Sequence, residues 1–155
     1  MPRTYTRQDL EVFNARGFGL IELLVVLGLM GIMAGGAVPE IHHMQQEWAL
    51  WGSTRLVESS LLWARTHAIA ANDSLTFIID QNGHRFYWQT SDGTRFENTI
   101  RWLPSGISII QSPRKPLRFF PHGNAVPAGT FVVHGEAGTY RVVVSVLGRV
   151  RVQRD

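Results

Sequence analysis

The sequence predicts an α+β fold in which a long N-terminal hydrophobic helix packs on an antiparallel β-sheet. Two observations support this prediction. The one long apolar run of the chain lies near its start, at residues 18–38. After residue 72 the hydrophobic period changes from that of a helix to that of strands, and no further helix is indicated. One helix followed only by strands is typical of an α+β domain.

The segment 18–38 has 21 residues and carries a single charge, Glu22. In a helix this length reaches about 32 Å, close to a bilayer core of about 30 Å. The run is apolar on every helical face, whereas a soluble amphipathic helix keeps one polar face. Arg3, Arg7 and Arg16 precede it, which favours a cytoplasmic N-terminus with the rest of the chain across the membrane. We therefore expect a transmembrane helix over 18–38.

A cleaved secretory signal peptide is the alternative for this run. Such a signal has a shorter apolar core and a small-residue cleavage site after that core. Here the small residue, Gly17, precedes the apolar run, and Glu22 lies near its start. An ionisable side chain at mid-membrane costs about 2.5–3.5 kcal/mol on insertion scales, so it is usually paired and functional. We expect a retained anchor whose carboxylate has a cationic partner.

Residues 39–72 are expected to form the amphipathic half of the same long helix, after a kink at Pro39. Two apolar stripes run along this half and indicate burial on two sides, against its own sheet and against other chains. Burial wholly within its own domain fits the pattern equally well. Turn-forming residues at 72–74 predict the end of the helix. The first stripe is Trp48, Trp51, Leu56, Leu62, Trp63, Thr66, Ile69 and Ala70, and the second is Leu50, Val57, Leu61, Ala64 and Ala68.

Residues 73–155 are expected to form a β-rich globular domain. Asn82-Gly83 predicts a two-residue type I′ turn between the first two strands, and Leu147-Gly148 leads into a closing hairpin. The predicted strands are 75–80, 85–90, 100–103, 107–111, 117–120, 130–134, 140–146 and 149–153.

The segment Gly17-Phe18-Gly19-Leu20-Ile21-Glu22, followed by the apolar helix, resembles the processing motif of type IV prepilins. The resemblance implies that residues 1–17 are a leader peptide and that a prepilin peptidase cleaves between Gly17 and Phe18. It implies methylation of the new Phe18 amino group, and pairing of Glu22 with the N-terminal amine of a neighbouring subunit during assembly. The sequence departs from the family in its glycine after Phe18, where threonine is common, and in its long leader.

Three downstream segments are similar to the GspH/FimT group of minor pseudopilins and minor pilins. They are Ala64-Arg65-x-x-Ala68-Ile69, Phe119-x-Pro121-x-Gly123 and Gly148-Arg149-Val150-Arg151. The group's fold, a long N-terminal helix with a β-rich globular part, is the pilin-like architecture expected above, and Pro39 sits where many pilins carry a helix-kinking proline. One functional branch of the group comprises minor pseudopilins of the type II secretion system. The other comprises minor type IV pilins, some of which bind DNA during uptake.

The sequence offers no persuasive catalytic or metal site. Its six histidines form neither His-x-x-x-His nor His-Glu-x-x-His, and it lacks a nucleophile elbow, a phosphate-binding loop and a dinucleotide fingerprint. The absence of cysteine excludes disulfides and thiolate ligands. We therefore expect a protein that is not an enzyme, with no cofactor and no bound metal.

Charge is unevenly distributed, with a balance of −4 over residues 18–100 and +6 over residues 101–155. In a strand, Arg149 and Arg151 point the same way about 7 Å apart, which suits successive backbone phosphates. DNA-binding FimT proteins use a Gly-Arg-x-Arg segment near the C-terminus, so the resemblance implies DNA binding by Arg149 and Arg151 after Gly148. Independently of the resemblance, Arg154 could widen the patch. A charge-protected edge strand and a salt-bridge surface toward an acidic subunit are the alternatives. Other cations that could join the patch are Arg114, Lys115, Arg118 and Arg141.

The leading prediction is a minor pseudopilin of the type II secretion system, anchored in the bacterial inner membrane with a cytoplasmic N-terminus and a periplasmic C-terminal domain. Its expected partners are prepilin peptidase, other pseudopilin or pilin subunits, and secreted protein cargo. The alternative is a FimT-like minor type IV pilin that binds DNA during uptake.

Overall fold

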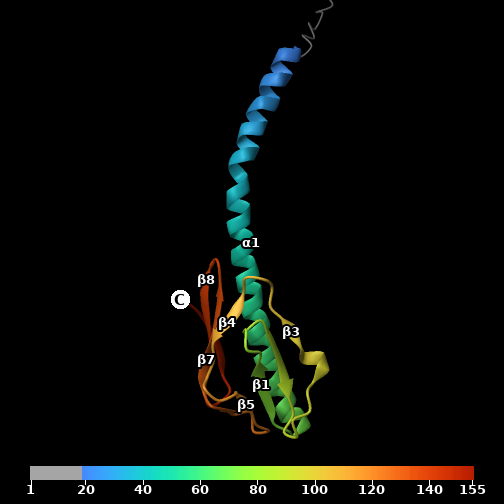
Figure 1. Ribbon diagram of the computed structural model, residues 1–155, viewed down its shortest axis with the longest axis vertical. Coiled ribbons are helices and arrows are strands. Elements are labelled where there is room, and N and C mark those ends of the chain that lie inside the picture. Colours follow the sequence, from blue (N-terminus) through green and yellow to red (C-terminus); the bar gives the residue numbers. More distant parts are fainter. Residues whose placement is uncertain (1–18) are drawn as a thin grey trace, which may run out of the picture. The chain divides into compact units, whose positions relative to one another are not determined.

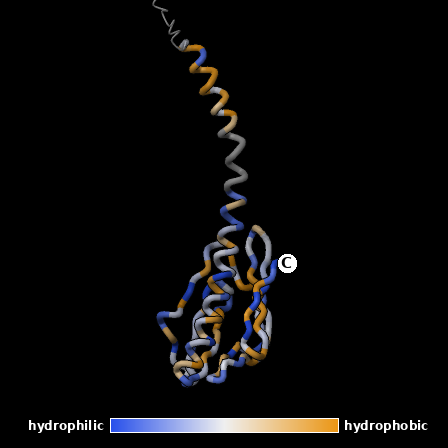
Figure 2. The backbone as a smooth tube through the Cα atoms, turned by 180° about the vertical axis from the view of Figure 1, so that it is seen from behind, coloured by the Kyte–Doolittle hydropathy of each residue, from blue (hydrophilic) through white to orange (hydrophobic). Residues whose placement is uncertain are grey.

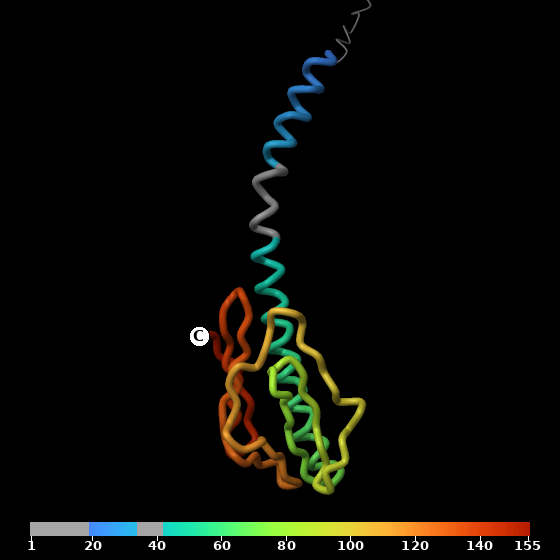
Figure 3. Tube along the Cα trace, in the orientation of Figure 1, coloured from blue at the N-terminus to red at the C-terminus, as the bar shows by residue number. Residues whose placement is uncertain are grey.

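The computed structural model describes the backbone of residues 19–155, except that the side chains of residues 34–41 are left undescribed. Figure 3 traces this course from the helix to the C-terminus. Two compact units make up the chain, Met1–Val38 and Pro39–Asp155. The expected leader, residues 1–17, lies outside the described residues, as does Phe18.

A single long helix, α1, spans Leu20–Ala71. It ends as predicted at Asn72, which adopts the left-handed conformation with φ of 51°. The N–H of Asn72 donates to the carbonyl of Ile69 at 3.4 Å, and the N–H of Asp73 donates to that of Ala68 at 3.2 Å. These two bonds form a Schellman motif, which satisfies carbonyls that the helix end leaves free. A kink at Pro39 stays a prediction.

The strands form two antiparallel sheets rather than one. The five-stranded sheet has the order β3-β2-β1-β5-β6, and the four-stranded sheet has the order β4-β7-β8-β9. Figure 1 labels β1 and β3 of the first sheet and β7 and β8 of the second around the second half of α1. The α+β class with a helix packed on antiparallel strands is confirmed. The elements after α1 are β1 (Leu75–Ile79), β2 (Arg85–Gln89), the 3₁₀-helix η1 (Glu97–Thr99), β3 (Arg101–Trp102), β4 (Ser108–Gln111), β5 (Arg118–Phe119), β6 (Ala125–Val126), β7 (Gly129–Gly135), β8 (Gly138–Val144) and β9 (Val150–Arg154).

The turn between β1 and β2 differs from the predicted type I′ turn. Its only left-handed residue is Gly83, with φ of 69°, whereas a type I′ turn needs positive φ at two positions. The Asp80 carboxylate accepts the N–H groups of His84 at 3.0 Å and Arg85 at 3.1 Å, which stabilises a wider loop. The side chain of Asp80, which lies outside the predicted turn pair Asn82-Gly83, therefore stabilises the observed geometry of this hairpin.

One stripe of α1 faces the core, and part of the other faces solvent. Every member of the second predicted stripe is buried, including Val57 and Leu61, which are fully covered. In the first stripe, Trp48, Leu62 and Ile69 are exposed. Both sheets cover the buried stripe, the five-stranded one mainly with aromatic side chains and the four-stranded one mainly with valines. The second half of α1 and the two sheets therefore share one core.

Candidate functional site

The N-terminal segment of α1 presents Glu22 in the first helical turn. The N–H groups of Glu22 and Leu23 donate to the carbonyl of Gly19 at 3.0 and 3.2 Å and begin the helix. Its described side chains up to Met33 are exposed, and most of them are apolar, as the hydropathy colours of Figure 2 show. Among the described residues, no helical stretch is both long and apolar enough to cross a membrane. The expected span, residues 18–38, lies partly outside them.

The two arginines of the Gly-Arg-x-Arg segment lie on one face of the four-stranded sheet. Val150 and Val152 pack against the core, whereas Arg149 and Arg151 are exposed. Since side chains alternate along a strand, the two arginines point away from the core on the same side, as the sequence predicts. The structure therefore brings Arg149 and Arg151 together on the outer face.

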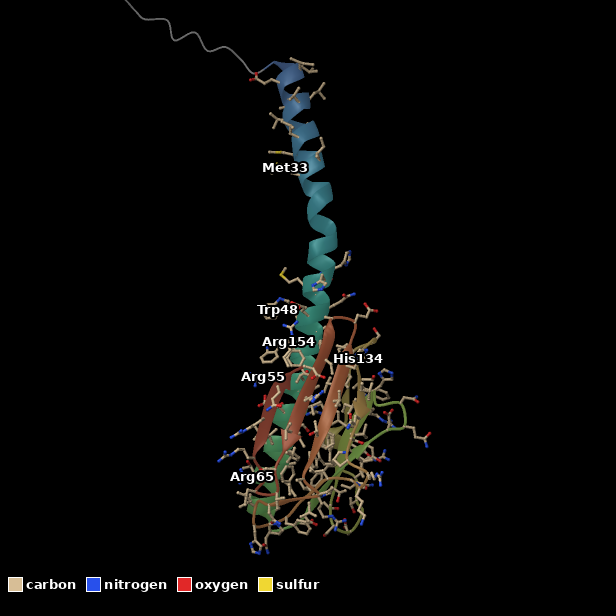
Figure 4. The ribbon with its side chains drawn as sticks, turned by 90° about the vertical axis from the view of Figure 1, so that its left-hand side faces the viewer. Met33, Trp48, Arg55, Arg65, His134 and Arg154 are labelled. Carbon is tan, nitrogen blue, oxygen red and sulfur yellow. The ribbon has the colours of Figure 1, made fainter. Side chains whose placement is uncertain are left out.

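Arg154 belongs to the opposite face. It follows Val152 by two residues, and its guanidinium forms an ion pair with Glu47 of α1 at 3.1 Å. It also lies 5.8 Å from the ring of Tyr140. Figure 4 places Arg154 beside the part of α1 that carries Trp48. The prediction that Arg154 widens the patch of Arg149 and Arg151 is therefore wrong, because Arg154 lies on the other face of the sheet.

Arg65 joins the three segments on which the family resemblance was based. Its Nε donates to the carbonyl of Gly123 at 2.9 Å, and its terminal nitrogen donates to the carbonyl of Leu147 at 3.2 Å. These segments are far apart in the sequence and meet only in the fold. Every residue has a backbone carbonyl, so the sequence does not indicate which carbonyls Arg65 contacts.

Gly148 needs to be glycine for two reasons. Its φ is 72°, and a Cβ built on it would lie 2.1 Å from the carbonyl oxygen of Gly123 and 2.7 Å from Nε of Arg65. The turn between β8 and β9 is further closed by the N–H of Ser145, which donates to the carbonyl of Arg149 at 2.9 Å. The backbone that carries Arg149 is therefore held on both sides.

Arg114 and Lys115 lie at the same end of the four-stranded sheet as Arg149. Pro113 packs so closely on Gly129 that a Cβ there would lie 2.2 Å from its Cγ. Gly129 is opposite Val144 in the ladder, and Val144 is opposite Val150, next to Arg149. The loop before β5 therefore adds two exposed cations to this end of the sheet.

A separate hollow of about 600 Å³ lies against α1. Trp63 and His67 stack there with ring centres 4.9 Å apart, and Phe96 meets His67 edge-on at 5.3 Å. Within residues 19–33 and 42–155, no group of three His, Asp or Glu side chains is placed to hold a metal ion. The three aromatic rings and Arg101 all line this hollow.

A long N-terminal helix whose second half packs on antiparallel sheets, preceded by the Gly17–Glu22 motif, defines a pilin-like protein. The family model described as "Type II transport protein GspH" matches residues 53–148. A second model, the "Prokaryotic N-terminal methylation motif", matches residues 13–38. The chain belongs to the GspH family, whose members are structural pilins and pseudopilins.

Individual relatives agree with this assignment. The pilin-like protein PilA1 of Thermus thermophilus is 29% identical over 160 residues, covering 89% of this chain and 98% of that protein. The minor pseudopilin EpsH of the type 2 secretion system of Vibrio cholerae has a TM-score of 0.55 at 17% identity, covering 66% of this chain and 94% of that one. The type IV minor pilin FimU of Pseudomonas aeruginosa has a TM-score of 0.54 at 17% identity, covering 72% and 90%. These two structures share the fold.

Proposed function

We propose that this protein is a minor pseudopilin of the type II secretion system, without enzymatic activity. The observation that carries the proposal is the combination, in one chain, of the methylation motif over residues 13–38 and the GspH family match over residues 53–148. The description of the matching family model as a type II transport protein supports the secretion branch. The precursor is inserted in the inner membrane with its N-terminus in the cytoplasm and its β domain in the periplasm.

Processing and assembly follow from the first residues of the helix. Prepilin peptidase cleaves between Gly17 and Phe18, and the new amino group of Phe18 is methylated. The carboxylate of Glu22 is exposed among apolar side chains in the first turn of α1. In an apolar filament core it gains most by pairing with a cation, and the amine of Phe18 from a neighbouring subunit supplies one. Residues 18–38 then serve first as anchor and later as filament core.

The pairing role of Glu22 is tested by replacing it with alanine and with glutamine in the natural host. We expect the leader to be removed as usual, and incorporation into sheared filaments to fall at least about tenfold, since an unpaired buried amine is costly. Glu97→Ala, an exposed carboxylate in η1, is the matched control and should assemble normally. Normal incorporation of both Glu22 variants would refute the pairing role.

The secretion role is tested by deleting the gene. Protein export should stop while DNA uptake continues, and the wild-type gene should restore export. Continued export together with lost DNA uptake would reject the secretion role and favour the other branch of the family.

The alternative function is a minor type IV pilin that binds DNA during uptake. It is favoured by the exposed pair Arg149 and Arg151 on the outer face, with Arg114 and Lys115 at the same end of the sheet. Arg154 contributes little to such a site because it pairs with Glu47 on the other face.

DNA binding is tested with the full chain in a non-ionic detergent, using a gel-shift assay with duplex DNA at low and physiological salt. If the alternative holds, binding weakens with salt, and Arg149→Ala combined with Arg151→Ala lowers the salt slope by about two. Arg95→Ala combined with Arg101→Ala, two exposed arginines beside β2 and in β3 of the other sheet, is the matched control. No shift at low salt would exclude this function.

A further inference from the structure

The edges of the two sheets differ in how they are covered. At β4, the N–H of Ile109 donates to the carbonyl of Gly83 at 2.9 Å, and at β6 the N–H of Ala125 donates to that of Val146 at 2.8 Å. The edge strand β3 has only two residues. β9 has five residues, Val150–Arg154, and no backbone partner on its outer side within the described part of the chain. β9 is therefore the long open edge.

The register of β9 shows which of its backbone groups are free. Bonds from Ser145 to Arg149 and from Asp155 to Thr139 mark the hydrogen-bonded pairs at both ends of this ladder. Hydrogen-bonded and non-bonded pairs alternate in an antiparallel ladder. The N–H and C=O groups that point outward consequently belong to Val150, Val152 and Arg154.

A groove lies beside this edge. One hollow of about 490 Å³ is bordered by Trp51, Arg55 and Glu58 of α1 and by the residues of β9 from Arg151 onward. A second hollow of about 350 Å³ continues it toward Met44 and shares Trp51 with the first. The ring of Trp51 packs 5.6 Å from that of Tyr140, so the shared wall is aromatic. A strand added to β9 finds an apolar surface for the side chains that it turns toward α1.

The charges along the edge select the kind of strand that fits. Arg55 pairs with Glu58 and Arg154 pairs with Glu47, both on the groove side. Arg151, on the outer face, has no ion-pair partner among the described residues. Pairing β9 with a second copy of itself would bring like charges together, which disfavours self-association. A strand with acidic side chains on the outer face places them opposite or diagonal to Arg151.

We propose that β9 accepts an extended, acidic segment of another protein as an additional antiparallel or parallel strand. Its acidic side chains alternate with apolar ones, the acids lying by Arg151 on the outer face and the apolar groups in the groove along Trp51. This is strand addition at a sheet edge, in which backbone hydrogen bonds supply affinity and alternate side chains supply specificity. The inference rests on the C-terminal sheet and α1 alone, and holds for either proposed function.

The test uses the full chain in a non-ionic detergent and a fluorescent peptide of sequence Glu-Val-Glu-Val-Glu-Val-Glu, followed by fluorescence anisotropy. We expect saturable binding, weakened at least about tenfold by Arg151→Glu and by replacing the peptide's glutamates with lysines. Arg101→Glu, the same charge change on the other sheet, is the control and should leave affinity within about twofold. The same peptide N-methylated at every residue should not bind, since it has lost its donors. No binding of the parent peptide, or equal binding of the lysine or N-methylated peptide, would overturn the proposal.

Amide hydrogen exchange gives a second readout that leaves the protein unchanged. With the glutamate peptide bound, the amides of Val150, Val152 and Arg154 should exchange at least about tenfold more slowly, while Arg151 and Gln153 change little. Unchanged exchange at saturation would place the peptide elsewhere and reject strand addition. Single-stranded oligothymidine should give no such protection; if it alone protects these amides, the edge is a nucleic-acid site and the proposal fails.

Discussion

At the scale of single residues, the C-terminal arginines depend on a contact between two turns. Arg65 reaches from α1 to the carbonyls of Gly123 and Leu147, and Gly148 lies against the first of these carbonyls. Two backbone segments can approach this closely only where one of them has no side chain. The position of Arg149 is thus set by residues that carry no charge as well as by Arg65.

Replacing Gly148 with alanine should lower the free energy of unfolding by more than the backbone strain alone would, because the added methyl group also clashes with its neighbours. A left-handed conformation costs a residue with a Cβ about 1–2 kcal/mol, and overpacking adds about 1–3 kcal/mol. Gly93→Ala is the control, because Gly93 has φ of 86° but open space around it. Urea unfolding of both variants should show an additional loss of at least about 1 kcal/mol for Gly148→Ala. Equal losses of stability in the two variants would mean that the turns at Gly123 and Gly148 can move apart at no cost in free energy.

Asp92 supplies a pH-dependent contact in the loop after β2. The hydroxyl of Thr90 donates to its carboxylate, as do the N–H and hydroxyl of Thr94 at 2.9 Å, and these bonds hold the pKa of Asp92 below its ordinary value. Because the pKa is lowered by folding, this contribution to stability is present above the unfolded pKa and is lost as pH falls through the folded pKa.

The Thr90→Val substitution should raise the pKa of Asp92 toward its ordinary value, since it removes the largest of these interactions. Carboxyl chemical shifts followed by NMR through acid pH would measure the change. Thr66→Val, on α1, should leave the Asp92 titration as it is in the wild type. An unchanged pKa in Thr90→Val would show that the Thr94 bonds alone lower it.

At the scale of elements, adjacent residues of α1 lie on different faces of the helix. Leu61 is fully buried, whereas 44% of Leu62 is exposed. The first belongs to the core shared with both sheets, and the second lies on the partly exposed stripe, for which contact with other chains is one of the two predicted alternatives.

Leu61→Ala should therefore lower the free energy of unfolding by about 2–5 kcal/mol, and Leu62→Ala by less than about 1 kcal/mol. Urea unfolding followed by near-ultraviolet circular dichroism would measure both. A neighbour that covers the exposed face would make Leu62→Ala impair filament assembly while the subunit stays stable. Similar losses of stability for the two variants would contradict the assignment of faces.

Much of this architecture follows from patterns in the sequence. The buried stripe at spacings of three, four and seven residues and the turn at Asn72 are local features, so both could be predicted. The division into two sheets could not, because it depends on pairs such as Leu75 with Phe119 that are distant in sequence. β6 has two residues, too few to show an alternating pattern. In the candidate site, strand alternation accounts for the common face of Arg149 and Arg151 and also for the opposite face of Arg154, once the strand continues to residue 154. Only the ion pair of Arg154 with Glu47 of α1 depends on a residue distant in sequence.

At the scale of the whole molecule, the two ends of the chain carry separate chemistry. The N-terminal motif matches a methylation signal, and the C-terminal third carries the excess of positive charge. The proposed processing concerns only the first end, so it can be altered without touching the fold of residues 39–155.

Gly17→Glu should block removal of the leader, because it puts a large charged side chain directly before the proposed cut between Gly17 and Phe18. Mass spectrometry of the wild-type protein should show loss of residues 1–17 and one added methyl group, and the variant should keep its full mass. The variant's β domain should unfold at the same urea concentration as the wild type. Normal trimming of Gly17→Glu would contradict the proposed cleavage site.

The contacts of Arg65 also bear on the order in which the chain can fold. Its acceptors lie 58 and 82 residues further along the chain, and the core stripe of α1 is covered by strands that extend to Val152. Pairings over such distances form slowly, and incomplete chains leave apolar surface uncovered. During synthesis, the buried side of α1 therefore stays partly uncovered until the chain has been made as far as Val152. The core of the β domain can close only when the β8–β9 hairpin is in place, which makes this hairpin the last of the described elements to be added to the core.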